Sequence, residues 1–90
     1  MKVLIIDDEE DTRSIASMSL SILGGLDVLE AESGAEGISK AAQEKPDVIL
    51  LDMMMPVMDG SETLVQLQQN EGTKHIPVIF LTAKAMTSEI

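Results

Sequence analysis

Short apolar runs recur along the chain, and polar or acidic segments separate them. The runs are Lys2–Ile6, Leu26–Ala31, Val48–Leu51 and Val78–Leu81. Most of them are nearly continuous and rich in branched aliphatic residues, a pattern typical of strands that are buried on both faces of a parallel sheet. The hydrophobic pattern therefore predicts four strands.

The segments between these runs carry helical signals. In the first, apolar residues recur at helical spacing and Gly24-Gly25 provides a stop. The second and third open with capping-box pairs, Ser33 with Glu36 and Asp59 with Glu62. The apolar positions that define the three helices are Ile15, Met18, Ile22 and Leu23, then Ile38, Ala41 and Ala42, then Leu64 and Leu67.

Strands that alternate with helices predict a doubly wound α/β fold with a parallel sheet and right-handed crossovers. The run Val78–Leu81 would leave an apolar sheet edge unless another element or another chain pairs with it. Residues 87–90 read as a helix cap followed by less than one turn, which is unstable alone. We therefore expect one domain over residues 1–90 that is incomplete at its C-terminal end, with dimerisation or strand exchange through the fourth strand as one consequence.

Composition narrows the function classes. The 90 residues are 44% apolar and carry a formal net charge of -10, which argues against binding of nucleic acid or an anionic membrane surface by this segment. No apolar run approaches the length of a membrane span, and no signal peptide opens the chain. The chain contains no cysteine, so disulfides and thiolate metal sites are excluded. We expect a soluble cytoplasmic protein.

Acidic residues follow two of the predicted strands. Asp7 and Asp8 come directly after the first strand, and Asp52 follows the third. In open parallel sheets, ligands bind at the carboxyl ends of the strands, so these carboxylates are expected to converge. Mutual repulsion would then keep one of them protonated or recruit a hard cation, for which Mg²⁺ is the natural candidate. The run Asp7–Asp11 alone is also explained as a helix cap. A further acid, Asp52, at the same edge of the sheet favours a ligand-binding site instead.

Three motifs together resemble the response-regulator receiver domain of two-component signalling. They are Leu4-Ile5-Ile6-Asp7-Asp8-Glu9, the segment from Asp52 to Gly60 that contains Met55-Pro56 and Asp59-Gly60, and Leu81-Thr82-Ala83. The motifs span nearly the whole chain, and the combination is far more specific than any one of them. The resemblance implies a flavodoxin-like doubly wound sheet of strand order 2-1-3-4, with the fifth strand and the last helices missing.

The resemblance also implies a role for each matching residue. Asp52 would be the phosphoacceptor, taking a phosphoryl group from a histidine kinase, a phosphotransfer protein or a small donor such as acetyl phosphate. Asp8, Asp52 and the backbone carbonyl of Met54 would bind Mg²⁺ directly, and Asp7 would bind it through water. Thr82 would be the switch hydroxyl, and the small Ala83 would leave access to the pocket. Such a domain is a phosphoacceptor with at most slow self-catalysed chemistry, not a conventional enzyme.

One departure from the family pattern concerns the phosphate-pairing lysine, which the family carries at the end of the fifth strand. The chain has no matching position, and Lys84, in the loop after Thr82, is read as a surface charge. We therefore expect weak or undetectable phosphorylation of this chain alone. His75, just before the fourth strand, lies at the wrong end of the sheet and is read as a loop residue.

Three other functions compete with a phosphoacceptor. A phosphatase of the haloacid-dehalogenase type needs a carboxylate two residues after the nucleophile, where this chain has Met54. A flavin or nucleotide binder would place phosphate-binding amides after the first strand, where this chain has acids. A phosphorylation-independent interaction module, a degenerate or truncated receiver, remains the alternative because the family's lysine is missing.

Overall fold

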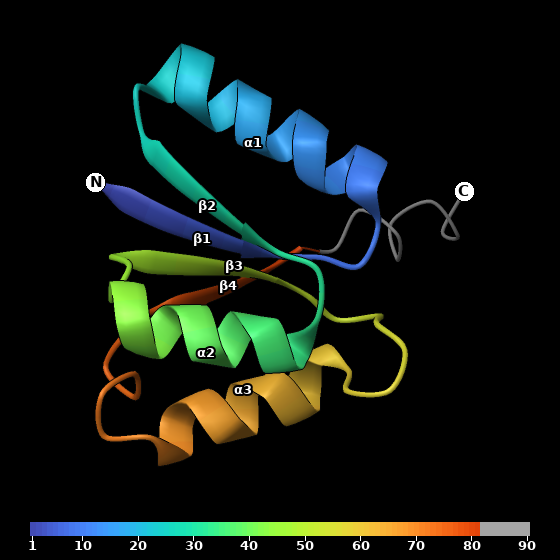
Figure 1. Cartoon of the computed structure of the whole chain (residues 1–90), viewed down its shortest axis with the longest axis vertical. Coiled ribbons are helices and arrows are strands. Elements are labelled where there is room, and N and C mark those ends of the chain that lie inside the picture. The colour runs from blue at the N-terminus through green and yellow to red at the C-terminus, as the bar shows by residue number, and fades with distance from the viewer. Residues whose placement is uncertain (82–90) are drawn as a thin grey trace.

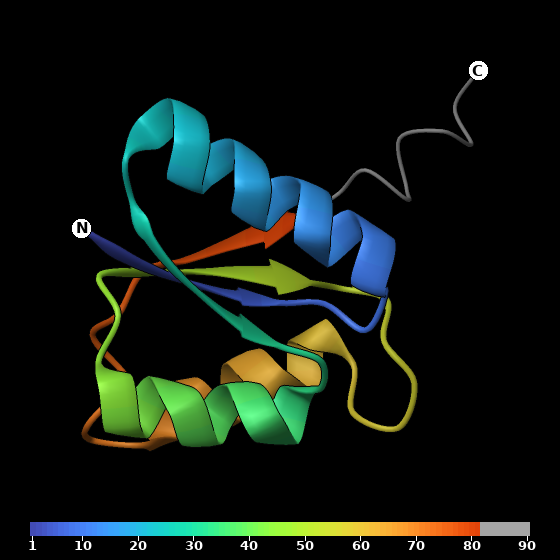
Figure 2. The same cartoon turned by 45° about the horizontal axis from the view of Figure 1, so that its top comes forward.

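The computed structural model describes residues 1–81, which form a central parallel sheet with helices on both faces (Figures 1 and 2). The strands are β1 (Lys2–Ile6), β2 (Asp27–Ala31), β3 (Val48–Asp52) and β4 (Val78–Leu81). Their order is β2-β1-β3-β4, and all three neighbouring pairs are parallel. The hydrophobic pattern predicts the doubly wound parallel sheet, and its flavodoxin-like strand order is the one that the resemblance to receiver domains implies. The third strand runs one residue further than expected and includes Asp52.

Three helices connect the strands: α1 (Glu10–Gly24), α2 (Gly34–Glu44) and α3 (Gly60–Gln69). Helix α1 lies on one face of the sheet, and α2 and α3 lie side by side on the other (Figure 2). Helix α1 ends at Gly24 and is followed by the C-cap Gly25, whose φ of 63° is left-handed, a conformation that glycine adopts without steric cost. The predicted stop after α1 is thus confirmed.

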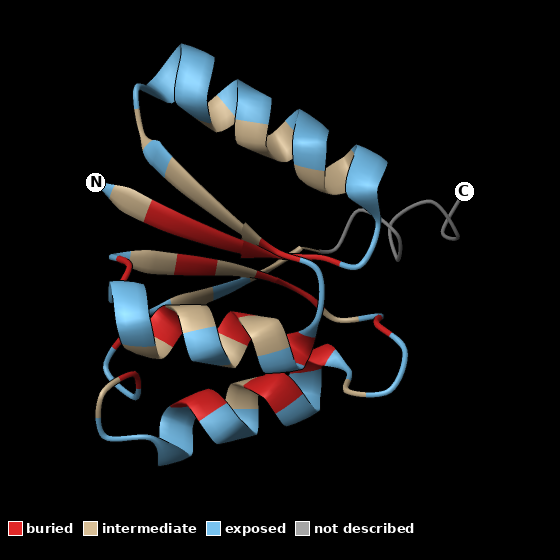
Figure 3. Ribbon diagram, in the orientation of Figure 1, coloured by how far each residue is buried: buried red, intermediate tan, exposed pale blue. Residues whose placement is uncertain are grey.

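The hydrophobic core lies between the sheet and the pair α2 and α3. Alternate residues of the strands face it, because successive side chains of a strand point to opposite faces. Figure 3 shows the buried residues concentrated in β1, β3 and the inner sides of these two helices. The fully buried residues of this core include Leu4, Ile6, Ile49, Leu51, Ala41 and Leu67.

Helix α1 is packed differently from the expectation that its apolar stripe suggests. Ile15, Met18, Ile22 and Leu23, the residues that predict the helix, are all exposed, Leu23 to 86%. The helix instead turns a face containing Ala16 and Leu20 toward β1 and β2, and none of its residues is fully buried. The spacing therefore predicts the helix correctly but does not identify the side that contacts the sheet.

Candidate metal centre

The sheet register places the carboxyl ends of β1 and β3 side by side. Ile6 of β1 lies opposite Leu51 of β3, so the next residues, Asp7 directly after β1 and Asp52 at the end of β3, lie at neighbouring positions. Asp7 still belongs to the sheet ladder on its other side, because its backbone N–H donates to the carbonyl of Ala31 over 3.1 Å. The predicted convergence of the two strand ends is therefore present in the structure.

Three carboxylates gather at this edge. One oxygen from each of Asp7, Asp8 and Asp52 lies within 4.8 Å of the other two. Asp7 and Asp52 are buried, at 1% and 2% exposure, whereas Asp8 is exposed. The site thus has a buried floor of two acids and an outer acid that faces solvent, which is an arrangement open to a ligand from one side.

Local hydrogen bonds orient the two buried acids. Asp7 Oδ1 accepts from the backbone N–H of Glu9 over 2.9 Å, and Asp52 Oδ1 accepts from the backbone N–H of Met54 over 3.0 Å. Each aspartate therefore stabilises the turn that leaves its own strand. These bonds fix the side-chain rotation of both acids before any ligand binds.

Arg13 contacts this site from the first helix. Its Nη1 donates to the backbone carbonyl of Asp7 over 2.8 Å, and its Nε donates to Glu30 Oε1 over 3.0 Å. The side chain is only 12% exposed. Arg13 thereby joins α1, β2 and the loop that carries two of the three acids. Sequence reasoning missed this residue, since a single arginine after an acidic run gives no local signal of such a contact.

The β3–α3 loop returns close to the site through Gly60. The backbone N–H of Gly60 donates to the carbonyl of Met53 over 3.0 Å. A Cβ atom at position 60 would lie 2.6 Å from Met53 Cα and 2.7 Å from the carbonyl oxygen of Asp52, so only glycine fits there. The Asp59-Gly60 pair thus combines a helix cap with a close backbone approach behind Asp52.

The residues present fit a magnesium ion. Mg²⁺ prefers oxygen ligands at about 2.0–2.1 Å, so oxygens on opposite sides of the ion lie about 4 Å apart. The spread of the three carboxylate oxygens, within 4.8 Å, is close to that span. Asp8 and Asp52 would therefore bind the ion directly and Asp7 through water, as predicted. The cation would offset the repulsion among the three carboxylates.

The sequence singles out four further residues, Met54, Thr82, Ala83 and His75. Met54 donates its N–H to Asp52 Oδ1 and is 63% exposed, and the role of its backbone carbonyl as a metal ligand stays a prediction. Thr82 and Ala83 lie outside the described residues, and their predicted roles stay predictions. His75 is exposed in the turn before β4, as expected for a loop residue. Among residues 1–81, every helix is too short or too polar to cross a bilayer.

Comparisons with known proteins agree with this geometry. Residues 3–90 match the response regulator receiver domain family, and the chain therefore belongs to that family. It is 42% identical over 83 residues to the alkaline phosphatase synthesis transcriptional regulatory protein PhoP of Bacillus subtilis, covering 92% of this chain and 33% of that protein. It is 40% identical to protein PilH of Pseudomonas aeruginosa, covering 92% of this chain and 68% of that protein.

Solved structures show the same fold. The N-terminal domain of a response regulator receiver protein from Methanoculleus marisnigri superposes with a TM-score of 0.84 at 32% identity, covering 97% of this chain and 74% of that one. The receiver domain of the sensor histidine kinase PA1611 from Pseudomonas aeruginosa gives a TM-score of 0.86 at 26% identity, covering 98% and 71%. That structure is described with a magnesium ion coordinated in its active site cleft.

Proposed function

We propose that this chain is the phosphoacceptor segment of a cytoplasmic two-component protein, in which Asp52 takes a phosphoryl group from a histidine kinase or a phosphotransfer protein. The observation that carries the proposal is the convergence of Asp7, Asp8 and Asp52 within 4.8 Å at the end of β1 and β3. Family membership supports a role in signalling. The chain spans about a third of the PhoP sequence, so the output of the whole protein is a further proposal.

In the proposed reaction, a carboxylate oxygen of Asp52 attacks the phosphorus of the donor, and an aspartyl phosphate forms as the bond to the donor's imidazole nitrogen breaks. Bound Mg²⁺ would supply electrostatic stabilisation of the phosphoryl oxygens. The Met54 N–H holds Asp52 Oδ1, which keeps the attacking group in one orientation. The protein would act as a stoichiometric acceptor with at most slow self-catalysed turnover, and Thr82 would turn toward the phosphoryl group to change a partner-binding surface.

A titration followed by NMR tests the metal step and the acceptor step separately. Mg²⁺ is expected to shift the amide signals of Asp7, Asp8 and Asp52, and beryllofluoride, a mimic of the phosphoryl group, is expected to add shifts around Asp52 only when Mg²⁺ is present. Asp52→Asn should abolish the beryllofluoride response. Asp27→Asn removes one charge from an exposed residue at the start of β2 and should change neither response. A beryllofluoride response that survives in Asp52→Asn would refute the acceptor assignment.

The alternative is an interaction module that works without phosphorylation. It is favoured if Mg²⁺ binds but beryllofluoride causes no further shift even in an extended chain that carries the family's lysine, since weak phosphorylation is already expected of this chain alone. Self-association through the exposed side of β4, or strand exchange there, is compatible with either function.

A further inference from the structure

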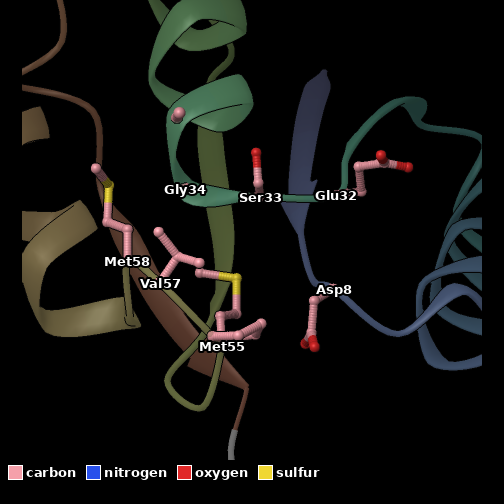
Figure 4. A pocket seen from close by; sticks show the side chains of 9 residues that line it. Asp8, Glu32, Ser33, Gly34, Met55, Val57 and Met58 are labelled. Carbon is pink, nitrogen blue, oxygen red and sulfur yellow. The ribbon is translucent and has the colours of Figure 1, made fainter.

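A second concave feature lies beside the acid cluster. Residues 32–35, where β2 leads into α2, and residues 55–58, after β3, enclose a pocket of about 300 Å³ together with Asp8. We call this the loop pocket. In Figure 4, Met55, Val57 and Met58 lie on one side of it, and Asp8 and Glu32 lie on the other. Its volume is at the lower end of the range for ligand pockets and suits a single large side chain.

The walls of the loop pocket are chiefly apolar and adaptable. Met55 is buried at 7% exposure and Met58 is half-buried, so their thioether chains form a floor that reaches solvent. Methionine side chains are flexible and polarizable, and they repack readily around an incoming apolar group. A methionine-lined pocket is therefore better suited to an apolar side chain than to a polar metabolite.

Val57 at the edge of the pocket is held in an unfavourable conformation. Its φ is 68°, which is the left-handed region, and its side chain is fully exposed. A β-branched residue rarely adopts a positive φ, because its Cβ substituents crowd the backbone there. The Met58 N–H donates to the Pro56 carbonyl over 2.7 Å and closes the turn around Val57, but the exposed valine side chain gains no burial in the free chain. The loop thus keeps an apolar side chain in solvent at the edge of an apolar pocket, as expected where a partner covers it.

The opposite margin of the pocket is acidic. Asp8 and Glu32, the two acids that line it, are both exposed. The Glu32 backbone N–H donates to Glu36 Oε1 over 2.8 Å, and Glu36 in turn pairs with Lys40 over 3.3 Å, so the acidic character of this margin comes from Asp8 and Glu32. The net charge of the chain is -10, so a partner approaching this margin is favoured if it is basic.

We propose that the loop pocket is a docking site for a basic protein segment that inserts one apolar side chain between Met55 and Met58 and places a neighbouring Lys or Arg beside Glu32. Val57 packs against the inserted residue and is covered in the complex. The binding surface lies next to the acid cluster but does not depend on phosphorylation of Asp52, so it extends beyond the proposed phosphoacceptor function.

Methionine methyl NMR on the whole chain tests the proposal. The probe is a short peptide with one leucine flanked by two arginines. The methyl signals of Met55 and Met58 are expected to shift saturably, while those of Met1 and Met18, which are exposed elsewhere, stay in place. Replacing the leucine of the peptide by alanine should weaken binding about tenfold, the effect of burying one such side chain. Replacing both arginines by glutamate should abolish the shifts.

Variants of the chain provide the complementary test. Ala35→Leu places a larger side chain at the pocket wall and should block the peptide, and Glu32→Lys should weaken it about two- to fivefold, as for an exposed ion pair. Glu71→Lys makes the same charge change at an exposed position after α3 and should bind with little change. Amide spectra of each variant verify the fold.

Three results would overturn the proposal. One is the absence of saturable shifts at Met55 and Met58 with the arginine peptide. Another is equal binding of the glutamate peptide, which would show an unselective apolar surface. The third is a shift of these methyl signals with protein concentration alone, which would identify a second copy of the chain as the occupant.

Discussion

At the scale of single residues, the acid cluster depends on Arg13 as well as on its carboxylates. We expect Arg13→Gln to lower the free energy of unfolding by about 1–3 kcal/mol, since a nearly buried side chain loses bonds to the Asp7 carbonyl and to Glu30. Urea unfolding followed by far-UV circular dichroism measures the change. Lys74→Gln, which removes a cation from an exposed pair with Glu71, should cost little. Equal effects of the two substitutions would contradict the assigned role of Arg13.

Glu36 gives the fold a pH dependence with a definite sign. Its pKa lies below the ordinary value of 4.5, first because the Glu32 N–H donates to its carboxylate and then because Lys40 is adjacent. A carboxyl whose pKa is depressed by folding stabilises the protein above its unfolded pKa, and that contribution is lost as pH falls through the folded pKa. Glu36→Gln should therefore destabilise the protein near neutral pH and do so progressively less below pH 4.5.

The measurement for Glu36 is the difference in unfolding free energy between the parent and Glu36→Gln across the acid range. The difference should shrink as the solution is acidified, because the parent's carboxylate becomes protonated and loses its advantage over the amide. A difference that is constant with pH would show that packing, and not ionisation, explains the effect of the substitution.

At the scale of elements, the helix starts differ in how completely they are capped. At α3, Asp59 Oδ1 accepts from the Glu62 N–H and the Glu62 side chain accepts from the Asp59 N–H, a full capping box. At α2, Ser33 accepts from the Glu36 N–H, but the Glu36 side chain binds the Glu32 N–H instead. The sequence pattern predicts both helix starts. It cannot distinguish the two arrangements, because the glutamate side chain accepts from the N–H of the N-cap residue at α3 and from the N–H one residue earlier at α2.

This difference predicts an order of stabilities. Asp59→Ala removes an anionic cap and one half of a reciprocal pair, so we expect it to lower the free energy of unfolding by about 1–2 kcal/mol. Ser33→Ala removes a single neutral bond and should cost about 0.5–1 kcal/mol. Urea midpoints of the two variants, compared with the parent, measure the order. A larger loss for Ser33→Ala would show that the second half of the capping box at α3 contributes nothing.

At the scale of the whole molecule, the elements were predictable because their causes are local, and the acid cluster because ligand sites of parallel sheets lie at the carboxyl ends of the strands. Buried strands show continuous apolar runs, caps precede helices, and parallel strand ends must share an edge, which brings Asp7 and Asp52 together. The strand order itself came from the resemblance to receiver domains. The packing of α1 was not predictable, since the side that a helix turns to the sheet depends on which other elements cover that face.

The resulting surface leads to a prediction about association. Val78 and Phe80 pack against the core beside α2 and α3, so Ile79, of opposite parity in β4 and 55% exposed, faces the side of the sheet that carries α1. Ile15, Met18 and Ile22 of α1 are exposed as well. An apolar surface beside an edge strand favours self-association, whereas the net charge of -10 opposes it.

We therefore expect the chain to self-associate in sedimentation velocity at high protein concentration, and to do so more strongly as added salt screens the repulsion between acidic copies. Ile79→Lys should reduce association because it places a charge on the exposed side of β4. Val65→Lys makes a comparable change at a 50% exposed position of α3, a helix on the opposite side of the sheet, and should leave association unchanged. A single monomeric species at all concentrations and salt levels would show that this surface does not drive association, and equal effects of the two substitutions would show that net charge alone controls it.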